Sequence, residues 1–165
     1  MAPPVVAIVS KKNSGKTTLI AKLIPELKKR GYRVGTIKHD VHGFDIDHEG
    51  KDSWMHKRSG AQTVVISSPR QVAVIKDMEE EETLDNLVNR YFDSEDIVIA
   101  EGYKRGNKPK IEVFRKAKHA TPLLQEDIQS IAIVSDDPTL DLGVPCIFID
   151  AISELADFIE ERFLL

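Results

Sequence analysis

Short apolar runs alternate with amphipathic stretches along most of the chain. The run VVAIV at 5–9 is uninterrupted, which is typical of a strand buried on both faces. From 17 to 30 the apolar residues recur at helical spacing instead, and they are Leu19, Ile20, Leu23, Ile24 and Leu27. A glycine at 31 ends this helix and a strand at 32–37 follows. The pattern predicts a βαβ unit with a right-handed crossover.

The rest of the chain continues this alternation. We expect further helices at about 52–58, 84–91 and 152–163, and strands at 63–67, 71–75, 96–100, 110–115, 131–134 and 146–149. Only Ser68, Pro69 and Arg70 separate two of these strands, so that pair must be an antiparallel hairpin. The prediction is an α/β fold in one domain over 1–165, with a mainly parallel sheet flanked by helices and an antiparallel hairpin extension.

A small, polar, lysine-bearing stretch joins the first strand to the first helix. Residues 10–17 read SKKNSGKT, which fits the phosphate-binding pattern G-x-x-x-x-G-K-[ST] except at Ser10. Small residues let backbone N–H groups approach phosphate oxygens, and the following helix N-terminus favours anions. The candidate nucleotide contacts are Asn13, Ser14, Gly15, Lys16, Thr17 and Thr18. The strand, loop and helix together predict a P-loop NTPase-like domain.

Two residues are candidates for metal binding and catalysis. The hydroxyl of Thr17 can ligate Mg²⁺, and Lys16 supplies a positive charge toward the β and γ phosphates. Such a loop needs an acid at the end of a neighbouring strand, and DIVIAEG at 96–102 offers Glu101. We predict Thr17 and Glu101 as metal ligands, and Lys16 and Glu101 as the catalytic pair.

Other polar residues follow predicted strands. Lys38 and His39 end the second strand, and strand C-termini gather around the ligand in sheets of this kind. The polar loop at 39–52 adds Asp47 and Asp52 as candidates, although such a loop can also be only solvent-exposed. Asp136, after a late strand, is the candidate for the edge of a guanine base, with an ordinary Asp-Pro turn at 137–138 as the alternative.

Composition narrows the classes of function. The chain has 23 basic and 27 acidic residues and a net charge of -4, which excludes a general nucleic-acid binder. Its apolar runs fall well short of the roughly 20 residues that cross a membrane. One cysteine, Cys146, forms no internal disulfide, and MAPPVV lacks a secretory n-region. We therefore expect a cytoplasmic protein without membrane or nucleic-acid partners.

Five segments together resemble the MobB family of molybdopterin-guanine dinucleotide biosynthesis adapter proteins. They follow the family's order over most of the chain, and they are IVSKKNSGKTTL at 8–19, GTIKHD at 35–40, GKDSWMHKRSGA at 50–61, IAEGYKRGNKPKIEVFR at 99–115 and ISELADFIEERF at 152–163. Many NTPases share the phosphate loop alone. The combination of IKH, GKDS and EGYK is much more specific.

The resemblance implies a function that composition does not. It implies GTP binding with weak GTPase activity, beside the guanylyltransferase that attaches GMP to the molybdopterin cofactor. It also implies a homodimer, for which the hairpin at 63–75 is a candidate contact. By position, residues 13–18 bind phosphate, and Lys38, His39, Asp52 and Ser53 flank the site. The stretch from Glu101 through Gly102 to Lys104 supplies the acidic strand end and nearby basic contacts. The family tolerates change at the first glycine of the loop, so Ser10 fits.

The leading hypothesis is a GTP-binding adapter that holds GTP and Mg²⁺ during molybdenum cofactor maturation. Whether it turns nucleotide over, as a slow GTPase, stays open. A rival is a stand-alone ATP-dependent small-molecule kinase, which would recruit arginines such as Arg58, Arg70 or Arg105 around the phosphates. A third reading is an interaction module that keeps the loop and binds no nucleotide.

Overall fold

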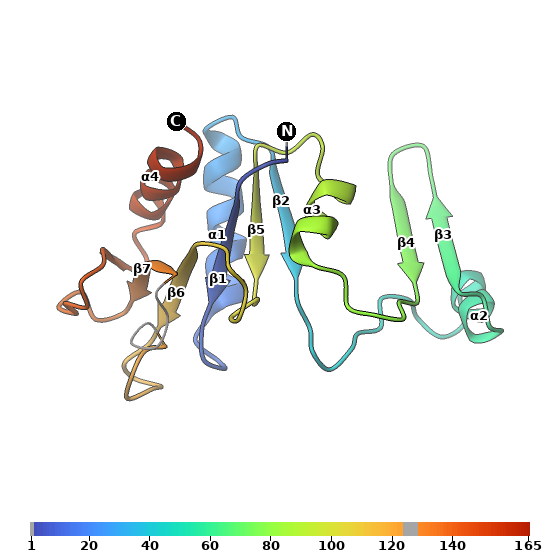
Figure 1. Ribbon diagram of the computed structural model, residues 1–165, viewed down its shortest axis with the longest axis horizontal. Coiled ribbons are helices and arrows are strands. Elements are labelled where there is room, and N and C mark those ends of the chain that lie inside the picture. The colour runs from blue at the N-terminus through green and yellow to red at the C-terminus, as the bar shows by residue number, and fades with distance from the viewer. Residues whose placement is uncertain (1, 124–128) are drawn as a thin grey trace. The chain divides into compact units, whose positions relative to one another are not determined.

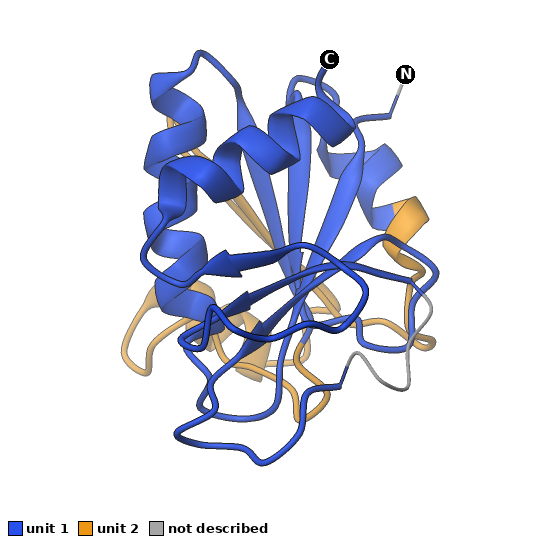
Figure 2. Ribbon diagram, turned by 90° about the vertical axis from the view of Figure 1, so that its left-hand side faces the viewer, with its two compact units in different colours: residues 1–39, 87–165 blue, residues 40–86 orange. Residues whose placement is uncertain are grey.

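The computed structural model describes residues 2–123 and 129–165, and these residues form two compact units. The sheet unit comprises residues 1–39 and 87–165, and the hairpin unit comprises residues 40–86 (Figure 2). A helix, α3 (Leu84–Tyr91), crosses the boundary between them. Within the described residues no helix combines the length and the apolar character needed to cross a membrane.

A six-stranded parallel sheet forms the centre of the sheet unit (Figure 1). Its strands run in the order β2-β5-β1-β6-β7-β8, and every pairing between neighbours is parallel. The elements of the unit are β1 (Val5–Val9), α1 (Lys16–Lys29), β2 (Val34–Lys38), β5 (Ile97–Glu101), β6 (Lys110–Phe114), β7 (Ser130–Ser135), β8 (Cys146–Phe148) and α4 (Ile152–Phe163). The predicted α/β fold with a mainly parallel sheet is confirmed.

The core of the sheet unit lies between one face of this sheet and two helices. α1 contributes Leu23 and Leu27, α4 contributes Leu155 and Ile159, and all four are almost completely buried. The helical spacing in the sequence placed these residues on one face, and each contributes about 1.5–3 kcal/mol on burial. β1 is buried along its whole length, as its unbroken apolar run predicted.

The end of α1 shows why the next strand starts later than expected. Gly31 adopts a left-handed φ of 97°, and its N–H bonds to the carbonyl of Lys28. The N–H of Tyr32 reaches back to the carbonyl of Leu27 at 3.2 Å. This closing turn uses Tyr32 as part of the helix end, so β2 begins at Val34 rather than at 32.

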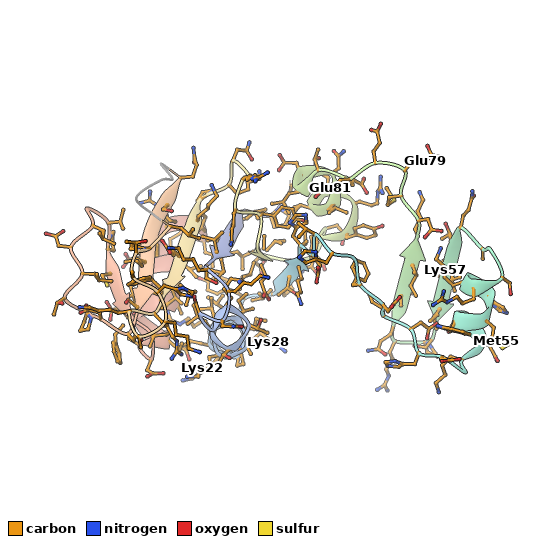
Figure 3. All side chains as sticks on the ribbon, turned by 90° about the horizontal axis from the view of Figure 1, so that it is seen from below. Lys22, Lys28, Met55, Lys57, Glu79 and Glu81 are labelled. Carbon is orange, nitrogen blue, oxygen red and sulfur yellow. The ribbon has the colours of Figure 1, made fainter. Side chains whose placement is uncertain are left out.

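The hairpin unit is built from α2 (Asp52–Arg58) and two antiparallel strands, β3 (Thr63–Ser67) and β4 (Val72–Lys76). The amine of Lys57, labelled in Figure 3, bonds to the Asp77 carboxylate and to the Ala61 carbonyl, which ties α2 to both strands' ends. The predicted hairpin is confirmed. Lys51 occupies the N-cap position of α2, and no side chain caps this helix.

One face of the hairpin is covered and the other is exposed. α2 packs against β3, and Val64 of that strand is buried. Val65 pairs with Val74 across the ladder, and both are exposed, at 58% and 45%. Val72 lies two residues from Val74, on the same face, and is 67% exposed. Three valines therefore form an apolar stripe in water.

Candidate functional site

The carboxyl ends of the parallel strands bring the predicted residues of the sheet unit to one edge. Lys38 at the end of β2 is in register with Glu101 at the end of β5, and Glu101 is in register with Ile8 of β1. The phosphate loop leaves β1 at this same edge, and Asp136 follows β7 there. This is the edge at which open α/β sheets bind ligands.

The phosphate loop has the backbone shape of an anion cradle. Asn13 and Gly15 adopt left-handed φ values of 61° and 91°, and Gly15 is the N-cap of α1. The carbonyl of Gly15 accepts the N–H of Leu19 at 2.9 Å, which starts the helix. Left-handed residues interspersed in a short loop turn successive N–H groups toward one side, and the dipole of α1 adds to their attraction for anions.

Ser10 occupies the glycine position of the motif without strain. Its backbone lies outside the left-handed region, so a side chain costs nothing there. Its hydroxyl is buried, donates to the Lys11 carbonyl at 2.6 Å and accepts from the Lys16 amine at 2.9 Å. Serine thus fixes the start of the loop and holds the amine of Lys16.

Positive charge is concentrated around the loop. Burial lowers the pKa of Lys16 most, Glu101 opposes that shift, and Lys104 and Lys38 lower it further. Both lysines are therefore close enough to Lys16 to repel its charge. A cluster of three lysines beside one carboxylate costs free energy when empty, and a polyphosphate would relieve that repulsion.

Thr17 and Glu101 form the candidate metal site. The Thr17 hydroxyl donates to Oε1 of Glu101 at 3.0 Å, although 84 residues separate them. Mg²⁺ takes oxygen ligands and usually keeps phosphate oxygens and waters beside one or two protein groups. The oxygen pair fits that requirement. Within the described residues no group of three or more His, Cys, Asp or Glu side chains could hold a metal ion.

His39 and Gly102 lie side by side at this edge. The N–H of His39 bonds to the Glu101 carbonyl at 3.0 Å, and the N–H of Gly102 bonds to Ile8. Gly102 has a φ of 97°, and a Cβ there would come within 3.4 Å of the His39 Cβ. The rings of His39 and Tyr103 stack with centroids 4.7 Å apart. Both residues therefore have fixed backbones beside Glu101.

Asp136 lines an open hollow of about 380 Å³ with Lys116, Ala117 and Asp137. One oxygen of Asp136 accepts the N–H of Lys116 at 2.9 Å. Asp137 is more heavily engaged, since it accepts from the Lys116 amine at 2.7 Å and from Thr139. These hydrogen bonds, that from Lys116 first, lower the pKa of Asp137 to about 2. Asp136 is thus the less occupied acceptor in this hollow.

Three contacts to the phosphate loop were missed from the sequence. Arg115 Nε donates to the Ser14 carbonyl at 3.2 Å, and His119 Nε2 pairs with the Lys12 carbonyl at 2.8 Å. Lys11 donates to the carbonyl and the hydroxyl of Thr121. These partners lie more than 100 residues away, so no local pattern could reveal them. The one available signal was the position of Arg115 at the carboxyl end of the strand predicted at 110–115.

Two predicted residues do not belong to the sheet unit. Asp52 is the first residue of α2, and Asp47 lies in the loop before it, so both belong to the hairpin unit. The Ser53 hydroxyl is the main cause that lowers the pKa of Asp47. Their roles toward nucleotide stay predictions.

A parallel sheet whose first strand leads through a lysine-bearing cradle into a helix defines the P-loop NTPase-like class. Within this class, residues 5–136 match the family of molybdopterin guanine dinucleotide synthesis protein B, MobB. The chain belongs to the MobB family.

Two relatives named molybdopterin-guanine dinucleotide biosynthesis adapter protein agree with this. The protein of Escherichia coli (strain K12) is 39% identical, over 96% of this chain and 92% of its own. That of Haemophilus influenzae is 36% identical, over 95% and 88%. A crystal structure of molybdopterin-guanine biosynthesis protein B superposes with a TM-score of 0.76 at 34% identity, covering 95% of this chain and 98% of that one.

Proposed function

We propose that the chain is a GTP-binding adapter in molybdenum cofactor biosynthesis, and that it assists the guanylyltransferase that attaches GMP to molybdopterin. The observation that supports nucleotide binding is that the cradle, Lys16 and the Thr17–Glu101 pair lie together at one edge of the sheet. The relatives, named as adapters for molybdopterin-guanine dinucleotide biosynthesis, support the pathway.

Each group at the edge has a role in this proposal. Backbone N–H groups of residues 13–18 hold the phosphates, and Lys16 leaves Ser10 to contact the β and γ phosphates. Thr17 and Glu101 hold Mg²⁺, directly or through water. Mg²⁺ would supply charge neutralisation between the phosphates. Lys38, His39 and Gly102 border the terminal phosphate.

The proposal includes slow turnover at most. Glu101 accepts the Thr17 hydroxyl, so its carboxylate is placed beside the metal position rather than held for an attacking water. A carrier of GTP benefits from such restraint, because hydrolysis would destroy the nucleotide before transfer. Asp136 would accept hydrogen bonds from the guanine edge with the oxygen that Lys116 leaves open.

The apolar stripe of Val65, Val72 and Val74 supports a homodimer through the hairpin. An isolated two-stranded hairpin is marginally stable in water, and a second copy of the stripe would cover the valines. We assign the protein to the cytoplasm as the compartment of nucleotide and cofactor assembly. The stand-alone ATP-dependent kinase is not favoured, because the relatives carry adapter names.

Nucleotide titration tests the proposal. By calorimetry with Mg²⁺, wild type should bind a non-hydrolysable GTP analogue more tightly than the ATP analogue. Lys16→Ala should weaken GTP binding by about 30-fold or more, since it removes a charge-assisted contact of about 2–4 kcal/mol. Asp136→Ala should reduce the preference for GTP over ATP. Equal affinity of wild type and Lys16→Ala for GTP would overturn the assignment of the loop, and ATP-dependent phosphorylation of an acceptor would favour the kinase.

A further inference from the structure

The outer side of the phosphate loop is held by side chains at three of its carbonyl groups. The Lys11 carbonyl accepts the hydroxyls of Ser10 and Ser14 at 2.6 and 3.0 Å. The Lys12 carbonyl pairs with His119 at 2.8 Å, and the Ser14 carbonyl accepts from Arg115 at 3.2 Å. The first of these contacts is local, whereas the other two come from the turn at 115–121 after β6.

Each of these carbonyls controls an N–H group of the cradle. In a trans peptide the C=O of one residue and the N–H of the next point in opposite directions. A donor that holds the Lys12 carbonyl therefore turns the Asn13 N–H to the other side, and the donor on Ser14 does the same for Gly15. Asn13 and Gly15 are also the two left-handed residues of the loop.

The donors suit this task chemically. Arg115 carries a permanent charge, and its guanidinium lies 3.4 Å from the position that a Cβ on Gly15 would take. A cation on the carbonyl oxygen polarises the peptide and makes the attached N–H a stronger donor to an anion. His119 contacts a carbonyl, which accepts only, so Nε2 carries the proton in this pairing. Neutral and protonated histidine both meet that need.

The turn itself is firmly anchored. The N–H groups of Lys118 and His119 both bond to the Arg115 carbonyl at 3.0 Å. Thr121 accepts the Lys11 amine, and the N–H of Leu123 bonds to the buried carboxylate of Glu112 at 2.7 Å. Arg115 directly follows β6, and Glu112 lies within that strand. The strand therefore holds the start of the turn and also Leu123, just after its end.

We infer that Arg115 and His119 are positioning residues that brace the phosphate loop from outside and preset the Asn13 and Gly15 N–H groups for phosphate. The inference rests on the proposed nucleotide site and deepens it. Neither residue touches the reacting phosphate. Their effect reaches the ligand through two peptide groups, so it falls on every nucleotide that uses the cradle, with or without a γ-phosphate.

A matched pair of variants tests the brace. Arg115→Met removes the guanidinium while keeping the side chain's length up to the Nε position, and Arg115→Gln places an amide N–H at that position without the charge. Lys118→Met removes an exposed charge from the same turn and serves as the control. Calorimetry with GDP and with the GTP analogue, both with Mg²⁺, gives the affinities.

We expect Arg115→Met to weaken both nucleotides by the same factor, about 10-fold, as the loss of a charge-assisted hydrogen bond would produce. Arg115→Gln should regain much of that loss, His119→Ala should cost about 3-fold, and Lys118→Met should change little. Unchanged affinity in Arg115→Met would overturn the inference while leaving the nucleotide site intact. A larger loss for the GTP analogue than for GDP, without recovery in Arg115→Gln, would overturn it in favour of direct contact.

A second measurement keeps the two proposals separate. In the nucleotide-free protein, the ¹⁵N-¹H signals of Asn13 and Gly15 report the orientation and polarity of these peptides. Arg115→Met should shift the Gly15 signal and His119→Ala the Asn13 signal, while Lys118→Met moves neither. Absence of these shifts would overturn the brace even in a protein that binds no GTP. If the wild-type protein binds no GTP, that result refutes the proposed function. The role of Arg115 and His119 in holding the loop is then decided by the NMR signals.

Discussion

The sheet unit and the hairpin unit differ in how much apolar surface each covers. Strand β5 of the sheet unit is buried at four of its five residues, and β6 is buried throughout. In the hairpin, β3 has one buried residue and β4 has none. The sheet unit therefore carries its own core and can hold a rigid site, whereas the hairpin exposes the surface that a partner would cover.

The polar residues follow the same division. In the sheet unit they converge, with Lys16, Thr17, Glu101 and Arg115 linked to the phosphate loop by hydrogen bonds. In the hairpin unit, Glu79 and Glu81 lie on the exposed segment between β4 and α3 (Figure 3). Convergence needs a rigid scaffold beneath it, because each donor must keep its direction within a narrow range.

The largest effect should come from the core of the sheet unit. Leu23→Ala should lower the free energy of unfolding by about 2–5 kcal/mol, because Leu23 is completely buried and its loss leaves a cavity. Val65→Ala in the hairpin should change it by about 0.5 kcal/mol or less in the monomer. Urea denaturation at low protein concentration measures both. A similar loss of unfolding free energy in the two variants would contradict the difference in packing between the sheet unit and the hairpin unit.

The next effect concerns association. Val74→Asp places a charge in the centre of the apolar stripe and should weaken the proposed dimer by about 100-fold, since like charges across an interface cost several kcal/mol. Val41→Asp, the same change at an exposed valine outside the hairpin, is the control. Sedimentation equilibrium gives the dissociation constants. A Val74→Asp protein that dimerises as wild type does would move the interface away from the hairpin.

The smallest effect is a pH dependence at the edge of the sheet unit. Asp137 has its pKa lowered to about 2, chiefly by Lys116, against an unfolded value of about 3.9. Because the pKa of Asp137 is lowered in the folded state, its contribution to stability is fully present above about pH 4. That contribution is lost as the pH falls through about 2. Asp137→Asn should reduce the change of the melting temperature with pH in this window. Asp93→Asn, the control, should leave that change as it is in the wild type. A carboxyl NMR titration of Asp137 near 4 would contradict the assignment.

The sequence was sufficient wherever one local pattern set the structure. The apolar run at 5–9 became β1, the helical spacing from Leu19 to Leu27 became the buried face of α1, and the three-residue turn at 68–70 required an antiparallel hairpin. Glu101 was found because it ends an apolar strand. The hydrogen bond from Thr17 bears out its position beside the loop, while its role as a metal ligand stays a prediction.

Other features depended on contacts between distant segments. Lys11 donates to Thr121, 110 residues further along the chain, and no residue near Lys11 indicates that partner. Two short-range contacts were also not evident from the apolar pattern. The Ser10 hydroxyl accepts from the Lys16 amine, and Tyr32 closes the end of α1, so β2 begins at Val34.

By itself, the sequence determined the alternation of strands and helices, the phosphate loop and the membership of the MobB family, since each depends on the order of neighbouring residues. Only the tertiary structure decided the strand order and the contacts of Arg115 and His119 with the loop. The reason is physical. A parallel sheet places strand ends together irrespective of their separation along the chain, so the partners of the loop are set by the packing of the sheet and not by local pattern.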